Sequence, residues 1–215
     1  MQSSLGGTRL KEIKFMNNNS SDIENGHHNG HEWVDLGLIS GLKWATCYVG
    51  ASSPEDFGDY FAWGETEPKE TYDNYNSLTY GLSILDLESQ GYIDSEGNLT
   101  PSHDAARVNW GGNWRMPTEE DVEDLKIECI WEWTTQNGVP GYNVIGPNGN
   151  SIFLPGVELG YDALVADGVC FWSSTPYNLS SIKNLAYVLD YRFGGGPDVD
   201  VHYCYYCALV RPVLE

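Results

Sequence analysis

The stretch DAARVNWGGNWRMPTEEDVEDL, residues 104–125, decides the fold, because it predicts two consecutive helices separated by a turn. The first helix covers residues 104–110 and ends at Gly111-Gly112, since glycine disfavours helix continuation. The second covers residues 118–129, with Thr118 as its N-cap and acidic residues at the positive end of the helix dipole. We expect its buried stripe to be Val122, Leu125 and Cys129.

The first turns of the second helix carry five acidic residues: Glu119, Glu120, Asp121, Glu123 and Asp124. Such a cluster is compatible with a metal or acid–base site and with a solvated helix surface. Its spacing favours the solvated surface, because carboxylates at a helix N-terminus stabilise the dipole without any ligand.

Short strands are predicted on both sides of the helices. Residues 32–38, 41–49 and 58–64 are rich in aromatic and β-branched residues and are bounded by Gly or Ser. Residues 65–100 are polar and punctuated by glycine, so we expect a long loop. After the helices come a strand at 131–135 and the hairpin GYNVIGPNGNSIFLP, residues 141–155, which turns at Pro147-Asn148-Gly149. Helices placed between groups of antiparallel strands indicate an α+β domain.

Two segments are expected along the chain, a flexible N-terminal leader over residues 1–31 and one domain over residues 32–215. Residues 17–31, NNNSSDIENGHHNGH, are of low complexity and have little apolar surface to bury. Metal chelation by the histidines of that tract would be adventitious: His27, His28 and His31.

Charge and hydropathy exclude several classes of function. The 215 residues carry 11 Lys and Arg and a formal net charge of −20, so a nucleic-acid partner is not expected. No apolar run approaches the roughly 20 residues that span a bilayer, and the N-terminus has no hydrophobic signal region. Membrane insertion is therefore not expected.

The C-terminal segment AYVLDYRFGGGPDVDVHYCYYCAL, residues 186–209, has an unusual composition. It contains no Lys, Glu, Gln, Met or Trp, and it is rich in tyrosine and small residues. Tyrosine offers a large amphipathic contact area at low cost in side-chain entropy, as in antibody paratopes. The composition therefore indicates binding rather than catalysis.

The five cysteines give no clear disulfide framework, because their number is odd and their spacing irregular. Cys204 and Cys207 have the spacing of half a zinc site or of a redox pair. A four-cysteine zinc site needs a second such pair, which the sequence lacks, and a redox motif needs a βαβ context. We expect two ordinary thiols, and no metal or cofactor.

Several separated motifs together resemble one family. They are GLKWATCYVG, GDYFAWGETEPK, the two-helix stretch, NGVPGYNV with LPG, FWSSTPY, and the final VRPV. In this order they are similar to the C-type-lectin-fold modules of gut Bacteroidetes and their phages. These include the Fibrobacter-type major paralogous domain and, more narrowly, the variable proteins of diversity-generating retroelements. The resemblance covers residues 32–215 and implies a C-type lectin fold with two helices and short antiparallel sheets.

The narrower resemblance implies a diversified surface over about residues 178–209. In such retroelements a mutagenic reverse transcriptase rewrites adenines, most often in AAC codons, and these changes cannot produce Lys, Glu, Gln, Met or Trp. All five types are among those missing from residues 186–209. The candidate diversified, ligand-binding positions are Val188, Asp190, Arg192, Phe193, Asp200, His202, Tyr203, Cys204, Tyr205, Tyr206, Cys207 and Ala208. The intervening positions are expected to point inward as scaffold: Tyr187, Leu189, Val199 and Val201.

The resemblance implies a receptor-binding display protein on a phage tail or a bacterial cell surface such as that of Bacteroides, with a part in host tropism. Its partner would be a cell-surface protein or glycan, and a rigid fold would present the changeable surface to that partner. We expect buried aromatic residues to hold that fold: Trp44, Trp63, Trp114 and Trp172.

The activities of two other families with this fold are not expected in this chain. Calcium-dependent sugar-binding lectins need ligand oxygens where this chain has Glu67-Pro68-Lys69, so no calcium site is expected. The formylglycine-generating oxidase uses two C-terminal cysteines, but its surrounding motifs are not recognisable here, and fold alone confers no activity. An enzyme is therefore not expected. The alternative from another class is a structural module of a surface or fimbria-like assembly, whose C-terminal strands only pack.

Overall fold

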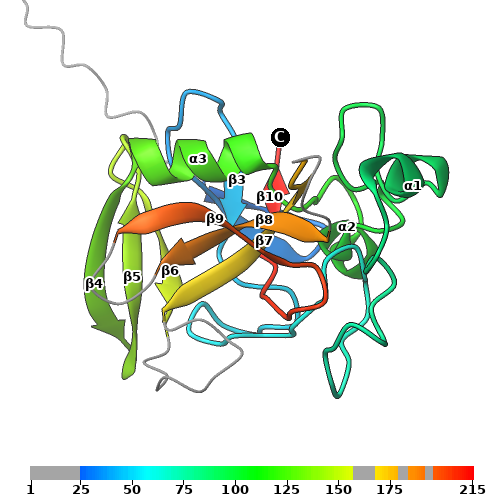
Figure 1. Cartoon of the computed structure of the whole chain (residues 1–215). Coiled ribbons are helices and arrows are strands. Elements are labelled where there is room, and N and C mark those ends of the chain that lie inside the picture. The colour runs from blue at the N-terminus through cyan, green and yellow to red at the C-terminus, as the bar shows by residue number, and fades with distance from the viewer. Residues whose placement is uncertain (1–24, 157–167, 179–183, 192–195) are drawn as a thin grey trace, which may run out of the picture.

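The computed structural model of the chain describes residues 25–156, 168–178, 184–191 and 196–215. In these residues three short helices and three antiparallel sheets form a mixed α+β fold (Figure 1). The helices are α1 (Ile84–Ser89), α2 (Ala105–Trp110) and α3 (Glu119–Glu128). The strands are β1 (Asn25–His28), β2 (His31–Asp35), β3 (Lys43–Ala45), β4 (Ile130–Gln136), β5 (Val139–Ile145), β6 (Ser151–Pro155), β7 (Val169–Pro176), β8 (Leu185–Tyr191), β9 (Pro197–Tyr203) and β10 (Val213–Leu214). The expected α+β class is confirmed.

The first sheet, in the order β1-β2-β3-β10, joins the two ends of the described chain. Val213 of β10 lies opposite Trp44 of β3, and Trp44 in turn lies opposite Val34 of β2. Because the last strand pairs with one of the first, the C-terminal segment is held in the body of the domain.

The expected boundary at residue 32 is wrong for residues 25–31, which belong to the domain. Asn29 and Gly30 have φ angles of 49° and 89°, the left-handed pair that a two-residue hairpin turn requires. The turn folds β1 onto β2, and the His31 ring stacks on Trp110 with 3.7 Å between ring centroids. The Asn29-Gly30 dipeptide could have predicted this hairpin from the sequence, but it lies in a tract whose low complexity indicated a flexible leader.

Both predicted helices are confirmed, and each begins at a capping side chain. Asp104 accepts hydrogen bonds from the backbone N–H of Arg107 at the start of α2 and from that of Met116 at 2.8 Å. Thr118 and Asp121 form a reciprocal capping box at the start of α3, and Asp121 pairs with Arg115 at 2.6 Å. Of the five acidic residues, Asp121 is therefore engaged in helix capping, whereas only Glu120 is exposed as a solvated surface would require. Val122 and Leu125 are fully buried, whereas Cys129 is only partly so.

The second sheet, β4-β5-β6, contains the predicted hairpin. Gly149 has a φ of 89° at the turn, and the register pairs Ile145 with Ser151. Val144 and Leu154 are fully buried and join the cluster that also holds Val122. The sheet therefore packs its apolar side against the rest of the domain.

The third sheet, β7-β8-β9, lies at the centre of the fold, with α3 against one side (Figure 1). Leu189 of β8 packs in the same apolar cluster as Leu125 of α3. Its neighbour Val188 packs in the other cluster with Trp172. The middle strand is thus buried on both faces, as strands between two layers are.

Two expectations for the central part of the chain need correction. Residues 58–64 form no regular strand, because only Phe61 makes a bridge, to Ala208. Residues 65–100 are not all loop, because α1 lies within them. Ser83 and Asp86 cap α1 reciprocally, a serine-to-acid spacing that predicts a helix start.

Candidate functional site

The predicted binding positions fall on β8, on β9 and on the turn that follows β9. Register places Val188 opposite Asp200, and Ala186 opposite His202. Directly opposed residues point to the same side of a sheet, so these positions share one face. Arg192 and Phe193 lie outside the described residues, as do residues 179–183 of the loop that was expected to complete the patch.

That face is directed at the core over much of its area, so the expectation of one exposed surface is wrong for four positions. The buried positions, each at most 3% exposed, are Val188, Asp190, Cys204 and Ala208. For Val188 and Asp190 the physical reason is that β8 is a middle strand, so alternation along it moves side chains between two buried faces rather than between core and water. Cys204 and Ala208 follow β9 and pack in the same apolar cluster as Val188. Of the expected scaffold positions, Leu189 is fully buried, and the others are half-buried: Tyr187, Val199 and Val201.

The remaining described positions are accessible to solvent. Asp200 is exposed, Tyr203 is 42% exposed, and four are half-buried: His202, Tyr205, Tyr206 and Cys207. The accessible part of the predicted site therefore lies on β9 and on the turn after it.

Three tyrosines of this turn contact one another. Tyr203 and Tyr205 stack with 5.2 Å between ring centroids, and Tyr206 meets Tyr205 edge to face at 4.9 Å. Tyr80 completes the group, since its ring meets Tyr205 edge to face at 5.4 Å. We refer to Tyr80, Tyr203, Tyr205 and Tyr206 as the tyrosine cluster. Edge-to-face contacts of this kind contribute about 0.5–1.5 kcal/mol each beyond area burial, so the rings support one another.

Tyr80 was not among the predicted site residues, because it lies more than a hundred positions earlier in the chain. The available signal was the tyrosine-rich composition of residues 65–100. What brings Tyr80 to the turn is a hydrogen-bonded framework: Trp63 N donates to the Cys204 carbonyl at 2.9 Å, and Thr79 Oγ1 donates to the Trp63 carbonyl at 3.1 Å. Gly81 N also donates to Asn184 Oδ1, one residue before β8.

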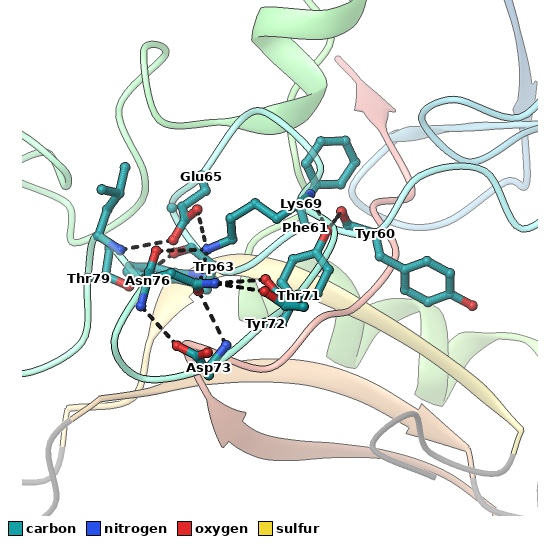
Figure 2. Close-up of polar contacts among 12 residues, drawn as sticks. Tyr60, Phe61, Trp63, Glu65, Lys69, Thr71, Tyr72, Asp73, Asn76 and Thr79 are labelled. Atoms are coloured by element: carbon teal, nitrogen blue, oxygen red, sulfur yellow. Dashed lines mark hydrogen bonds and ion pairs between the residues drawn. The ribbon is translucent and has the colours of Figure 1, made fainter.

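The loop that leads to Tyr80 is held by one lysine. Figure 2 shows Lys69 reaching across the loop to Glu65 and Asn76. Its Nζ lies 2.8 Å from Glu65 Oε2, 3.0 Å from the Asn76 carbonyl and 3.1 Å from Asn76 Oδ1. Glu65 is buried, and its other oxygen accepts a hydrogen bond from Leu78 N at 2.9 Å. A fixed ammonium group thus organises this loop.

Buried tryptophans form the scaffold below the cluster, as expected. Trp44, Trp63, Trp114 and Trp172 are each 0% exposed. Trp63 Nε1 donates to the Ser173 carbonyl at 3.0 Å, and Trp172 Nε1 donates to the Phe61 carbonyl at 2.8 Å. These two bonds tie residues 61–63 to β7.

Arg211, in the VRPV motif, is a buried cation that fastens distant segments. Its Nη2 donates to the carbonyls of Thr46 at 2.8 Å and Phe153 at 3.1 Å, and its guanidinium lies 4.9 Å from the centroid of the Tyr48 ring. Burial lowers the pKa of Arg211. The motif therefore has a structural role.

The five cysteines are all free thiols. Burial raises the pKa of Cys204 to about 12, and burial also raises the pKa of Cys207. Because the thiolate is the nucleophile and the metal ligand, Cys204 is unsuited to either role near neutral pH.

One group of possible metal ligands stands next to the tyrosine cluster. Asp190, Asp200 and His202 each present a ligand atom, and these atoms all lie within 4.8 Å of one another. The sequence predicted these residues as binding positions but not as metal ligands. The signal in the sequence was Asp200 and His202 two residues apart on one strand.

Comparisons with protein-family models, with curated proteins and with solved structures found no significant match. Among the residues that the structure describes, no helix has the length and apolar character needed to cross a membrane. A hollow of about 270 Å³ lies between residues around α2 and the C-terminus, and its lining includes Asp94, Arg107 and Glu215 but none of the tyrosine cluster.

Proposed function

We propose that this chain is a ligand-binding display protein with a C-type lectin fold, and that it binds through the tyrosine cluster. The main support for this proposal is that four tyrosines from two distant segments meet at a partly exposed turn, above a scaffold of fully buried tryptophans. Tyrosines of this kind supply contact area without a large loss of side-chain entropy.

The fold assignment has support from where three of the resembling motifs lie. The two-helix stretch gives α2 and α3, FWSSTPY lies mainly in β7, and VRPV ends in β10 beside β3. Each of these three motifs therefore contributes residues to a regular element of the domain.

Eight of the proposed diversified positions fall into two sets by their exposure. Asp200, His202, Tyr203, Tyr205 and Tyr206 are accessible and form the proposed contact surface, with Tyr80 as a contact from the preceding loop. Val188, Cys204 and Ala208 fill the core, where replacement by a residue of another size costs several kcal/mol. We therefore propose that a retroelement varies the first set and that the second set is constrained by packing.

The proposed partner is a protein or glycan on a bacterial cell surface, with the chain carried by a phage tail or a cell. Broad, partly exposed aromatic surfaces suit macromolecular partners, whereas small molecules occupy enclosed pockets. The chain's net charge of −20 also disfavours anionic polymers as partners.

The test measures binding of the purified chain to a glycan array and to a panel of intact bacterial cells. Tyr203→Ala, Tyr205→Ala and Tyr206→Ala should each weaken binding by about tenfold or more, because a few aromatic anchors dominate interfaces. Tyr75→Ala is the matched control, since Tyr75 is 93% exposed and lies outside the cluster. Equal binding by all four variants and the original chain would favour the structural-module alternative.

A further inference from the structure

A second site is built into the sheet beside the tyrosine cluster. Strands β8 and β9 lie side by side in the third sheet (Figure 1). Asp190 lies on β8, and Asp200 and His202 lie on β9. Asp200 and His202 are two residues apart, so their side chains leave the same face of β9. Because Val188 lies opposite Asp200, the face shared by Val188 and Asp190 is also the face of the β9 pair.

The three side chains span the distance from the core to the solvent. Asp190 is 3% exposed, His202 is partly buried, and Asp200 is exposed. The His202 ring is set against Trp172, edge to face with 6.4 Å between centroids. Asp190 is therefore fixed in the core, His202 is held by packing against an aromatic ring, and Asp200 lies on the solvent side of the group.

The spacing of the two inner groups matches a metal coordination sphere. His202 Nε2 lies 3.4 Å from Asp190 Oδ2. Two atoms bound tetrahedrally to zinc at about 2.0–2.1 Å are about 3.3–3.4 Å apart. The pair therefore already has the spacing of two ligands on one ion, and a ligand atom of Asp200 lies within 4.8 Å of both.

The chemistry of the donor atoms points the same way. Two carboxylates and one imidazole together supply the oxygen and nitrogen ligands that first-row divalent metal ions take in proteins.

We propose that Asp190, Asp200 and His202 form a binding site for a first-row divalent transition-metal ion, with Zn²⁺ as the ion that fits best. One imidazole and two carboxylates suit zinc and its neighbours better than Mg²⁺ or Ca²⁺, which take oxygen ligands alone. Three protein ligands leave a coordination position toward solvent, on the side of Asp200. The ion would join β8 to β9 immediately before the turn that carries the tyrosine cluster.

The experiment uses the full chain after chelator treatment, titrated with Zn²⁺ by calorimetry and with Co²⁺ by visible spectroscopy. Asp200→Asn and His202→Gln are the informative variants, because both side chains reach solvent and neither fills the core. His27→Gln is the matched control, since the His27 side chain is exposed and lies 3.2 Å from Glu32, outside the site. Near-ultraviolet circular dichroism establishes that each variant is folded.

We expect one equivalent of Zn²⁺ to bind the original chain and the His27→Gln variant. Each site variant should bind Zn²⁺ at least about tenfold more weakly. Loss of a residue that only hydrogen-bonds to a metal ligand already costs about tenfold or more, so loss of a ligand should cost at least as much. The Co²⁺ spectrum should lack a thiolate charge-transfer band, because no cysteine is a ligand. Absence of Zn²⁺ binding would overturn the proposal, and His202 and Asp190 would then be an ordinary side-chain pair. Unchanged Zn²⁺ affinity in both site variants would also overturn it. The Zn²⁺ titration does not depend on whether the chain binds cells or glycans, so the metal site and the proposed function can fail separately.

Discussion

At the scale of the residue, tryptophan and tyrosine have different roles in this chain. The four expected core tryptophans are buried, and the indole N–H groups of Trp63, Trp114 and Trp172 donate to backbone carbonyls. The tyrosines of the cluster contact each other at the surface instead. The tryptophans therefore carry stability, and the tyrosines remain available for contact.

Truncating a scaffold tryptophan should be far more damaging than truncating a cluster tyrosine. Trp172→Ala and Trp114→Ala should lower the free energy of unfolding by about 3–5 kcal/mol, since each leaves a large cavity and removes a hydrogen bond from the indole to a backbone carbonyl. Tyr205→Ala and Tyr206→Ala should cost about 1 kcal/mol, the value of an aromatic contact. Denaturant midpoints measure both, and equal losses in the two classes would show that the tyrosines are part of the core.

At the scale of the element, local signals were sufficient wherever one segment determines its own structure. The Thr118 cap marked the start of α3 in the sequence, Gly111-Gly112 marked the end of α2, and the Pro-Asn-Gly turn marked the β5–β6 hairpin. Alternation along β8 was not sufficient. It placed Val188 at the surface, whereas the structure buries it. No local pattern in the sequence shows that α3 covers one face of the sheet and that the apolar cluster around Trp172 covers the other. The same limit explains Tyr80, whose contact with Tyr205 depends on long-range hydrogen bonds.

The loop before Tyr80 should depend on Lys69. Lys69→Met removes the ion pair with Glu65 and the hydrogen bonds to Asn76, and it leaves a buried carboxylate without its cation. We expect a loss of about 1–3 kcal/mol in stability and faster proteolysis within residues 65–79.

The control for Lys69 is a double-mutant cycle with Glu65→Gln. Because the amide introduced by Glu65→Gln carries no charge, the double variant should be more stable than the sum of the two single losses implies. Strict additivity of the two changes, or an unaltered Lys69→Met variant, would show that the pair does not organise the loop.

At the scale of the whole molecule, the domain begins earlier than composition indicated. β1 pairs with β2, the Trp114 indole donates to the His28 carbonyl at 2.9 Å, and Asn113 N donates to His28 Nε2 at 2.9 Å. Hydrophobic patterning identified the class of the fold and its main strands. A polar edge strand has no such pattern, because its contribution lies in backbone pairing and in a few ring contacts.

Removing residues 1–31 should therefore destabilise the domain relative to removing residues 1–24. The longer deletion takes away β1 and the His31 ring that stacks on Trp110. We expect a drop in Tm of several degrees, because a loss of about 1 kcal/mol shifts Tm by about 2–4 °C in a chain of this size. Calorimetry on the two truncated chains makes the comparison, and identical unfolding curves would place residues 25–31 outside the cooperative unit.

The central claim is that an accessible, varied surface stands on a constrained scaffold, and the DNA beside the gene tests it most directly. We predict a nearby reverse-transcriptase gene and a second copy of the segment coding for residues 178–209, differing from it at adenines. The differences should fall in codons for accessible positions such as Asp200, Tyr203 and Tyr205, and they should spare those for Val188 and Ala208. The absence of such a copy, or differences concentrated in the codons of the buried positions, would contradict the account.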